Sequence, residues 1–386
     1  MQHLVRYFLA LTIIGTSLVD APNVLATQAR KLSPVINAIS NQAEKIPAYR
    51  NRFNRTRPVI VVLGENSGTE LTDFVIPYGV LSQSGIAEVF AVAMQPGPIT
   101  MRPALRIQPQ LTVDQFDRRF PDGADYVIVP AMVKNDDPKV LGWITAQAGK
   151  GSVLMSICDG ALVMANAGLL RDHRATAHWA TQGLRAEKYP GTQWLKNVRY
   201  VADGRVVSSA GISASMPVSL ALVEAIAGYD AAGILAKKLG VDDWSSRHDS
   251  DQFQPKFGVN ISAFSRTLVL NRWFHSVRNI GVPLSTGVDE IALAFTADAY
   301  SRTGRSQAYS VAASDAPVMT RHGLVVLPDR IEGAEKTWRI THVLPAFSVM
   351  PSAQALDQAL LGIAKIFGRT TAYGVALDFE YPGFRQ

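Results

Sequence analysis

The sequence predicts an α/β fold, a three-layer sandwich in which helices cover both faces of a mostly parallel sheet. Short apolar runs rich in β-branched residues alternate with helical segments over residues 57–240, which is the rhythm of strand–helix–strand units. The only cysteine, Cys158, stands where a strand pattern changes abruptly to a helix pattern. Ligands of such sheets bind at the carboxyl ends of the strands, so the cysteine is predicted to lie where a ligand binds.

The first half of this region supplies the predicted centre of the sheet. Residues 71–84 have the apolar spacing of a helix, and Gly85 is placed to end it. The run that precedes this helix is dominated by β-branched residues, as expected of a buried strand. The predicted strands are residues 58–63, 89–93 and 125–130, and a second predicted helix covers residues 140–148.

Cys158 is predicted to lie at a one-residue corner. Residues 152–157 are an apolar run of strand length, and residues 161–167 are rich in good helix formers, with Gly168 after them. A helix that begins just after the cysteine directs its free N–H groups and its positive dipole end at the sulfur, which favours the reactive thiolate. The alternative is that Cys158 is a small buried apolar residue.

Residues 158–179, which end in Ala-Thr-Ala-His-Trp, resemble the nucleophile-elbow block of the ThiJ/PfpI superfamily. The resemblance covers residues 57–240 and includes a first strand, a first helix with an acidic residue, and a closing hairpin followed by a glycine turn. It implies the flavodoxin-like fold that these proteins share with class I glutamine amidotransferases. The subgroup that the chain resembles most is the sensor half of AraC-type transcriptional regulators.

The resemblance also implies partners for Cys158. Asp73 matches the acidic residue whose carboxyl hydrogen-bonds the cysteine sulfur, and Glu70, one helical turn earlier, is a second candidate. His178 matches the histidine that lies close to the cysteine in many members. The alternatives are that Asp73 faces solvent on its helix and that His178 is a structural residue ahead of Trp179.

Backbone N–H groups at the elbow, around Cys158, Asp159 and Gly160, form the predicted oxyanion site. Asp159 stands where the family usually has a small or hydroxyl-bearing residue. A carboxylate there raises the pKa of the neighbouring thiol unless its side chain turns away.

The rest of the predicted pocket departs further from the family pattern. Ala131 and Met132 stand where many members carry two glycines, after the strand that faces the elbow. Their side chains restrict the backbone and fill space that a substrate would use. Gly211 is the predicted glycine of the closing turn. These differences favour a pocket for sensing, binding or an altered substrate.

The distribution of charge and the absence of known binding motifs in the sequence favour a small molecule as the partner. The net charge is +6, but lysines and arginines are scattered, and no pair of helices resembling the regulators' helix-turn-helix domain follows the sensor-like region. We therefore expect no nucleic acid. We also expect no cofactor and no metal, because the chain has no phosphate loop and no zinc-ligand spacing. The acids around His248 offer a metal site as the alternative to a solvated loop.

The N-terminus predicts export. A short, weakly basic start precedes the apolar run 7–19, and small or aliphatic residues follow at 24–26, where a signal peptidase cuts. Residues 1–26 are thus a signal peptide, which places the protein in the periplasm or outside the cell. The alternative is a membrane anchor through residues 7–19.

The C-terminal third carries a partial repeat of the first domain. Two linkers, residues 27–56 and 241–279, flank the ThiJ/PfpI-like domain at 57–240, and residues 280–386 form the half-repeat. We expect either a homodimer or an intramolecular pseudo-dimer, in which the half-repeat packs where the second subunit of a related homodimer would lie. A shift of 219 residues superposes Ser82 on Ser301, Gly85 on Gly304, Val92 on Val311, Ala93 on Ala312, Pro98 on Pro317, Arg102 on Arg321, Leu105 on Leu324 and Pro109 on Pro328.

Together these observations predict an exported ThiJ/PfpI-like protein whose Cys158 acts on or senses a small electrophilic molecule. If it is an enzyme, it is a cysteine-dependent hydrolase, hydratase or lyase. The alternative is a non-catalytic ligand-binding, sensor or interaction module derived from the regulator sensor domain. Fold alone does not decide between them.

Overall fold

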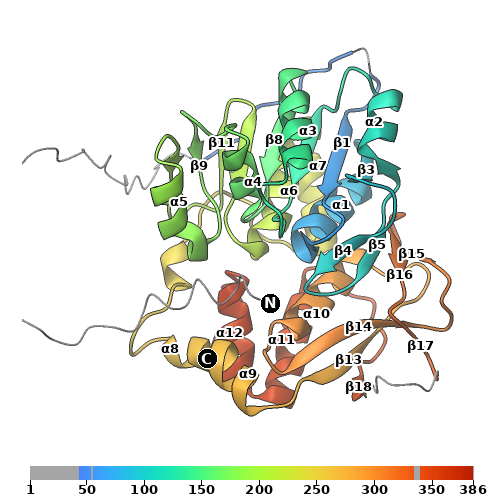
Figure 1. Cartoon of the computed structure of the whole chain (residues 1–386), viewed down its shortest axis with the longest axis vertical. Coiled ribbons are helices and arrows are strands. Elements are labelled where there is room, and N and C mark those ends of the chain that lie inside the picture. The colour runs from blue at the N-terminus through green and yellow to red at the C-terminus, as the bar shows by residue number, and fades with distance from the viewer. Residues whose placement is uncertain (1–42, 54, 334–339, 386) are drawn as a thin grey trace, which may run out of the picture. The chain divides into compact units, whose positions relative to one another are not determined.

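The computed structural model describes residues 43–53, 55–333 and 340–385 (Figure 1). The predicted leader, residues 1–26, and most of the first predicted linker lie outside this part of the chain. Over the described residues, no helix has both the length and the apolar character needed to cross a membrane.

In the described part of the chain, the largest sheet consists of β1 (Val59–Gly64), β3 (Glu88–Ala93), β6 (Leu111–Thr112), β7 (Tyr126–Val129), β8 (Val153–Ser156), β11 (Tyr200–Asp203) and β12 (Val206–Ser209). Their order is β11–β12–β8–β7–β1–β3–β6. Every neighbouring pair is parallel except the hairpin of β11 and β12. Ile60 at the centre lies opposite both Val89 and Tyr126.

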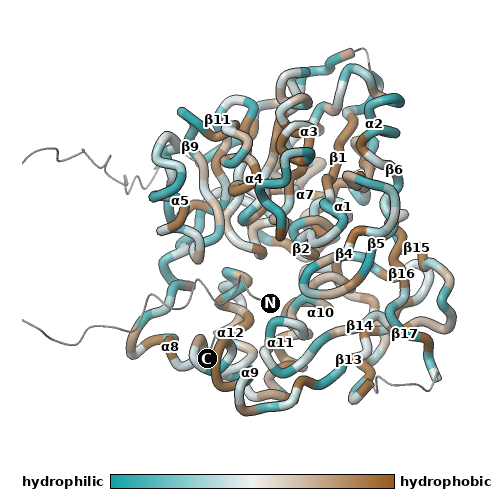
Figure 2. The backbone as a smooth tube through the Cα atoms, viewed as in Figure 1, coloured by the Kyte–Doolittle hydropathy of each residue, from teal (hydrophilic) through white to brown (hydrophobic). Residues whose placement is uncertain are grey.

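Helices cover both faces of this sheet, so the predicted three-layer α/β sandwich is confirmed. The central strand β1 is apolar along its length (Figure 2). Its Ile60 and Val62 pack into one apolar cluster, and Val59 and Val61 pack into another on the opposite face. The first face is covered by α1 (Leu71–Ser84), α6 (Ser215–Ala227) and α7 (Tyr229–Leu239), and the second by α2 (Val113–Arg119), α3 (Pro138–Gly149) and α4 (Gly160–Asn166).

The predicted elements agree closely with the observed ones because their local signals are strong. The helix predicted at residues 71–84 is α1, and Gly85 ends it in the left-handed conformation, with φ 68°. The strands predicted at 58–63, 89–93 and 125–130 are β1, β3 and β7, each shifted by a residue or so at its ends.

The described end of the first predicted linker is packed against the sandwich. Glu44 forms an ion pair with Arg174 at 2.8 Å, and Ile46 is buried in the core. The backbone N–H of Tyr49 donates to the carbonyl of Ala225 at 2.8 Å. The partners in these contacts lie far away in the sequence. The local sequence of the segment therefore predicts only a linker.

A second, parallel sheet lies in the C-terminal region. It consists of β13 (Arg278–Pro283), β14 (Ser306–Ala312), β17 (Arg330–Ile331) and β18 (His342–Val343), in the order β17–β14–β13–β18. Three helices accompany it: α10 (Glu290–Ser301), α11 (Gln354–Phe367) and α12 (Arg369–Asp378).

The shift of 219 residues also relates the elements of the two regions. β13 covers the positions that correspond to β1, and α10 begins at the position that corresponds to the first residue of α1. Similarly, β17 corresponds to β6, and β16 (Val325–Leu327) corresponds to β5 (Arg106–Gln108). The C-terminal region therefore has the same order of strands and helix as the start of the main sheet.

A third sheet joins the two regions. It consists of β2 (Thr69–Glu70), β4 (Ile99–Arg102), β5, β16 and β15 (Val318–Met319), in the order β15–β16–β5–β4–β2. β5 and β16 pair antiparallel, and Ile107 lies opposite Val326, its own counterpart under the 219-residue shift. The pairing is thus self-complementary, as at the two-fold axis of a dimer.

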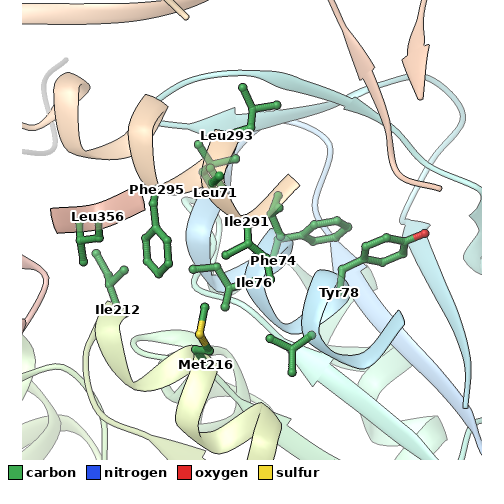
Figure 3. Packing of buried hydrophobic residues seen from close by; sticks show 14 of the residues in the cluster. Leu71, Phe74, Ile76, Tyr78, Ile212, Met216, Ile291, Leu293, Phe295 and Leu356 are labelled. Atoms are coloured by element: carbon green, nitrogen blue, oxygen red, sulfur yellow. The ribbon is translucent and has the colours of Figure 1, made fainter. Parts of the chain in front are cut away.

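Apolar side chains fill the space between the regions (Figure 3). α1 packs against α6 on one side and α10 on another. A Cβ atom on Gly79 would lie 2.7 Å from Cγ1 of Ile291, so the small residue lets the two helices approach closely. Phe74 from α1, Phe295 from α10 and Met216 from α6 belong to one buried cluster.

The second predicted linker, residues 241–279, contains helical structure. α8 (Ile261–Ser265), a π-helical segment at Arg266–Leu270 and α9 (Asn271–Phe274) follow one another, and the first two pack on α12. Buried Ala263, Thr267 and Asn271 recur along this stretch. The spacing of apolar residues does not predict this helical segment, because two of the three buried residues are polar.

We predict that a chain ending at residue 240 aggregates. The truncation removes α10 and β16, which exposes the apolar surface of α1 and leaves the edge of β5 unpaired. Size-exclusion chromatography with light scattering measures this. A soluble, monomeric and fully folded truncated chain would contradict the role given to the C-terminal region.

Ile291→Ala in the full chain is a milder test of the same contact. Removing a fully buried isoleucine is expected to lower the free energy of unfolding by about 2–5 kcal/mol. Ile234→Ala, at an exposed position on α7, is the matched control and should change it by less than about 0.5 kcal/mol. Chemical denaturation measures both, and equal effects would contradict the prediction.

Candidate active site

Cys158 lies at a strained corner between β8 and α4. Its φ is 54°, in the left-handed region that residues other than glycine rarely adopt. Its backbone N–H donates to Oγ of Ser209 at 3.3 Å. Gly160 is required two residues later, because a Cβ atom there would lie 2.0 Å from the carbonyl oxygen of Val129. The backbone thus holds the cysteine at the carboxyl end of β8, as predicted.

The surroundings of Cys158 favour the thiol over the thiolate. Burial raises the pKa of the Cys158 thiol well above its ordinary value, and the carboxyls of Asp73, Asp159 and Glu70 raise it further. The hydrogen bond from the backbone N–H of Asp159 acts the other way but is smaller. The expectation that the helix dipole makes a thiolate is therefore wrong for this structure, because desolvation outweighs the N–H groups of the short helix α4.

Asp73 faces the interior and not solvent. It is fully buried on α1, and its Oδ2 accepts a hydrogen bond from the backbone N–H of Ala131 at 3.1 Å. Its Oδ1 is buried without a hydrogen-bond partner among the described residues. Burial raises the pKa of the Asp73 carboxyl well above its usual range, despite that N–H and the charge of Arg302. The protonated form of this carboxyl is therefore favoured over a wider pH range than that of an ordinary aspartate, and its charged form interacts with the thiol of Cys158.

Arg302 brings three further carboxyl groups to the site. It forms ion pairs with Glu70, with Asp298 at 2.5 Å and with Asp378 at 2.7 Å. Burial raises the pKa of Glu70 well above its usual range, although the charge of Arg302 opposes the shift. Asp298 also accepts a hydrogen bond from Thr72 at 2.9 Å. The cluster ties β2 and α1 to α10 and α12.

His178 is placed by contacts other than the cysteine. Its Nδ1 accepts a hydrogen bond from the backbone N–H of Ala180 at 3.2 Å, which makes Nε2 the protonated nitrogen. Nε2 lies 2.9 Å from the carbonyl oxygen of Asp378, to which it donates. Both ring nitrogens thus have partners in this structure, and the structural alternative accounts for the geometry. A base role for His178 stays a prediction.

The C-terminal turn after α12 inserts Glu380 among residues of the first region. Glu380 is fully buried, and its Oε2 lies 2.7 Å from Nε2 of His248. Its Oε1 accepts a hydrogen bond from the backbone N–H of Trp179 at 3.1 Å. A Cβ atom on Gly211 would lie 2.7 Å from the Glu380 carboxyl, so glycine leaves room for it. His248 therefore takes part in a buried hydrogen bond to Glu380 and is not part of a solvated loop.

The charge on Glu380 is favoured despite its burial. Burial alone would raise the pKa of this carboxyl, but the hydrogen bond from His248 and the electrostatic interactions with His178 and His248 hold the pKa below its usual value. Among the described residues, no group of three or more histidine, cysteine, aspartate or glutamate side chains is arranged to hold a metal ion.

The predicted oxyanion groups are only partly free. Asp159 is half-buried, and its Oδ1 accepts a hydrogen bond from Oγ1 of Thr181 at 2.7 Å, so the side chain has its own partner. The backbone N–H of Gly160 donates to the carbonyl of Ile157 at 2.8 Å. The N–H of Asp159 is directed at the sulfur of Cys158. Of these groups, only the backbone N–H of Asp159 points at the sulfur of Cys158.

The residues that replace the family's two glycines have structural roles here. Ala131 holds Asp73 through its N–H, and its carbonyl accepts a hydrogen bond from the N–H of Glu70 at 2.9 Å. Met132 is buried and belongs to the cluster on the second face of the sheet. The space that glycines would leave open is thus filled by the methionine side chain.

The pattern of the sequence did not predict Arg302, Asp378 and Glu380 as site residues. All three come from the C-terminal region, more than a hundred residues away from Cys158. The predicted half-repeat was the one signal in the sequence that pointed to this region, because it was expected to pack against the first region.

The fold and the site define a class: α/β sandwiches with a cysteine at a strained strand–helix corner beside a buried carboxyl. Residues 57–225 match the model of the DJ-1/PfpI family. The chain is also 31% identical over 171 residues to an isonitrile hydratase from Pseudomonas putida, which covers 43% of this chain and 72% of that protein. This chain belongs to the DJ-1/PfpI family.

Two solved structures illustrate the similarity. Drosophila melanogaster DJ-1beta matches with a TM-score of 0.44 and 20% identity, over 49% of this chain and 100% of that one. An AraC family transcriptional regulator from Pseudomonas putida matches with a TM-score of 0.41 and 17% identity, over 47% of this chain and 98% of that one. Both matches span about half of this chain.

We predict that Cys158 is alkylated by iodoacetamide only at alkaline pH. Its pKa is raised, so the thiolate forms above the ordinary thiol pKa of about 8.5. Asp159→Asn removes a negative charge that raises this pKa, and the labelling curve should move to lower pH. Mass spectrometry of labelled protein against pH measures the curve.

Asp230→Asn, at an exposed position on α7, is the control and should leave that curve in place. Rapid labelling of the native protein well below pH 8 would contradict the electrostatic description of the site.

Proposed function

We propose that this DJ-1/PfpI-family chain is an exported protein whose Cys158 acts on, or senses, a small electrophilic molecule. One observation carries the proposal: Cys158 is held at φ 54° beside Asp73, a buried carboxyl whose Oδ1 has no hydrogen-bond partner among the described residues. Strained backbone and unsatisfied buried polar atoms are both costly, and both concentrate at functional sites.

The pair can perform a nucleophilic addition without a further reactant. The sulfur of Cys158 forms a bond to the electrophilic carbon, and one π bond of the substrate breaks. In the proposed step the carboxyl of Asp73 starts in its protonated form, which its raised pKa favours; it gives this proton to the atom that receives the electron pair and takes up the proton of the thiol. The proton count is unchanged. A raised thiol pKa is compatible with this step because both protons move together.

The substrate class is an aldehyde, amide, isocyanide or imine-like carbon. The isonitrile hydratase relative favours the isocyanide. Water then releases the product from the sulfur, so turnover would be that of a hydrolase, hydratase or lyase. The buried site, with Met132 in place of glycine, favours a small substrate.

A second candidate is a non-catalytic ligand-binding, sensor or interaction module. The burial of Cys158, its raised pKa and the occupied N–H groups of the elbow favour it. A cavity of about 190 Å³, lined by residues that include Ser213, Met216, His248 and Tyr381, offers a place for a ligand. Cys158 is not among its lining residues.

Export rests on the sequence pattern of residues 1–26, with a signal peptide favoured over an anchor at residues 7–19. Neither a nucleic acid nor a cofactor is part of the proposal.

We further propose that the chain is an intramolecular pseudo-dimer, whose C-terminal half-copy occupies the place of a second subunit. Residue contacts across the regions support a pseudo-two-fold axis. Thr72 hydrogen-bonds Asp298, and Gly79 lies against Ile291. Under the 219-residue shift, Thr72 corresponds to Ile291 and Gly79 to Asp298, so the two contacts exchange. Such reciprocity is the mark of an isologous interface.

Incubation with an alkyl isocyanide and with a small aldehyde tests the proposed chemistry. We expect a covalent adduct on Cys158 by mass spectrometry, or turnover that Cys158→Ser abolishes. Asp73→Asn should slow either by about 10²–10⁴-fold because it removes the proton carrier. Asp230→Asn is the control, and circular dichroism checks the fold of each variant.

Activity that survives in Cys158→Ser would overturn the catalytic proposal. A wild-type protein that forms no adduct and shows no turnover, but binds small molecules by calorimetry, would establish the second candidate.

A further inference from the structure

The helical segment between the two regions exposes an unusual amount of apolar surface. In the described part of the chain, the side chain of Phe257 is 96% exposed, that of Trp273 79% and that of Phe274 70%. We define the aromatic basic surface as these three aromatic residues together with the exposed apolar residues and the exposed arginines between residues 257 and 278. The apolar neighbours are Val259, Ile261, Val269, Leu270 and Val277.

Most of this surface belongs to α8, the π-helical segment and α9, which are firmly attached by their other side, whereas Phe257 and Val259 lie in the turn that precedes α8. α8 and the π-helical segment pack on α12, next to which they lie in Figure 1. The contact is close, since a Cβ atom on Gly374 would lie 2.5 Å from the Cγ2 atom of Thr267. Asn271 is fully buried and donates to the carbonyl of Thr303 at 2.8 Å. The exposed residues are thus displayed by an ordered element.

The charge on the aromatic basic surface is entirely positive. No aspartate or glutamate occurs in residues 256–288. Arg266, Arg272 and Arg278 are exposed among the apolar side chains. Arg305 lies close to Arg266 and Arg278. Burial is the larger cause of the lowered pKa of Arg305, and the positive charges of Arg278 and Arg266 lower it further. Among the described residues, none of these arginines forms a salt bridge with a carboxylate within 4.0 Å.

Two of the arginines are held in place by one aromatic ring. The guanidinium groups of Arg278 and Arg305 both lie over Phe367, at 5.7 Å and 5.2 Å from the ring centre. Like charges at such close range repel each other unless anions lie nearby. A partner that fits this surface must therefore carry negative charge for the arginines and provide an apolar environment for the exposed aromatic side chains.

We propose that the aromatic basic surface binds the face of an anionic lipid bilayer. Tryptophan and phenylalanine on an ordered helix enter the boundary between headgroups and acyl chains, and arginines bind the phosphates at the same level. A soluble acidic protein would match the charges but would not explain why Trp273 and Phe274 stay exposed. A second copy of the chain would bury the aromatic residues but would bring arginines against arginines.

Vesicle co-sedimentation of the full chain tests this proposal. The protein should bind vesicles of phosphatidylcholine mixed with phosphatidylglycerol and bind those of phosphatidylcholine alone much more weakly, and added salt should weaken binding. Arg266→Gln with Arg278→Gln should reduce affinity about thirtyfold, or about fivefold for each arginine. Trp273→Ala with Phe274→Ala should reduce it at least about tenfold.

The control variant removes two exposed apolar residues elsewhere, Ile234→Ala with Leu361→Ala, and should bind like the unaltered chain. Because all variants keep residues 1–42, any contribution of the N-terminus is common to them. Equal binding by all variants, or no preference for phosphatidylglycerol, would overturn the proposal. So would a dimer, detected by light scattering, that the tryptophan variant converts to a monomer.

Discussion

The buried ion cluster around Arg302 is the interaction on which the rest of the structure depends. Arg302 belongs to the C-terminal region, yet it pairs with Glu70 next to α1 as well as with Asp298 and Asp378. Buried carboxyl groups are tolerated only when they are paired or protonated. One guanidinium faces three carboxyls here, and their pKa values shift in different directions: those of Glu70 and Asp298 are raised by burial, whereas that of Asp378 is lowered, despite burial, by the charge of Arg302. The charge of Arg302 also opposes the rise that burial causes in the pKa of Asp73.

The same cluster makes the two regions one functional unit. α1 carries Asp73 and packs against α6 of the first region and α10 of the second, so both regions contribute to the surroundings of this acid. The C-terminal turn adds Glu380, which contacts Trp179 and His248 at the edge of the elbow.

The elbow illustrates how two physical effects compete at one atom. A helix N-terminus and a backbone N–H favour a thiolate at Cys158, whereas burial and three carboxyls favour the thiol. Desolvation prevails because the side chain is buried and its helix has only seven residues. The pKa values of Cys158 and Asp73 are both raised, so the environment favours the protonated form of each group.

Local signals in the sequence determined the sandwich and the position of the cysteine. Alternating β-branched runs, Gly85 as a helix stop and the turn at Cys158 depend on neighbours in the chain, so one sequence suffices to predict them. Only the tertiary structure decided the raised pKa of Asp73, the partners of His178 and the contribution of Arg302. These depend on burial and on groups up to about two hundred residues apart, and no local pattern encodes such distances.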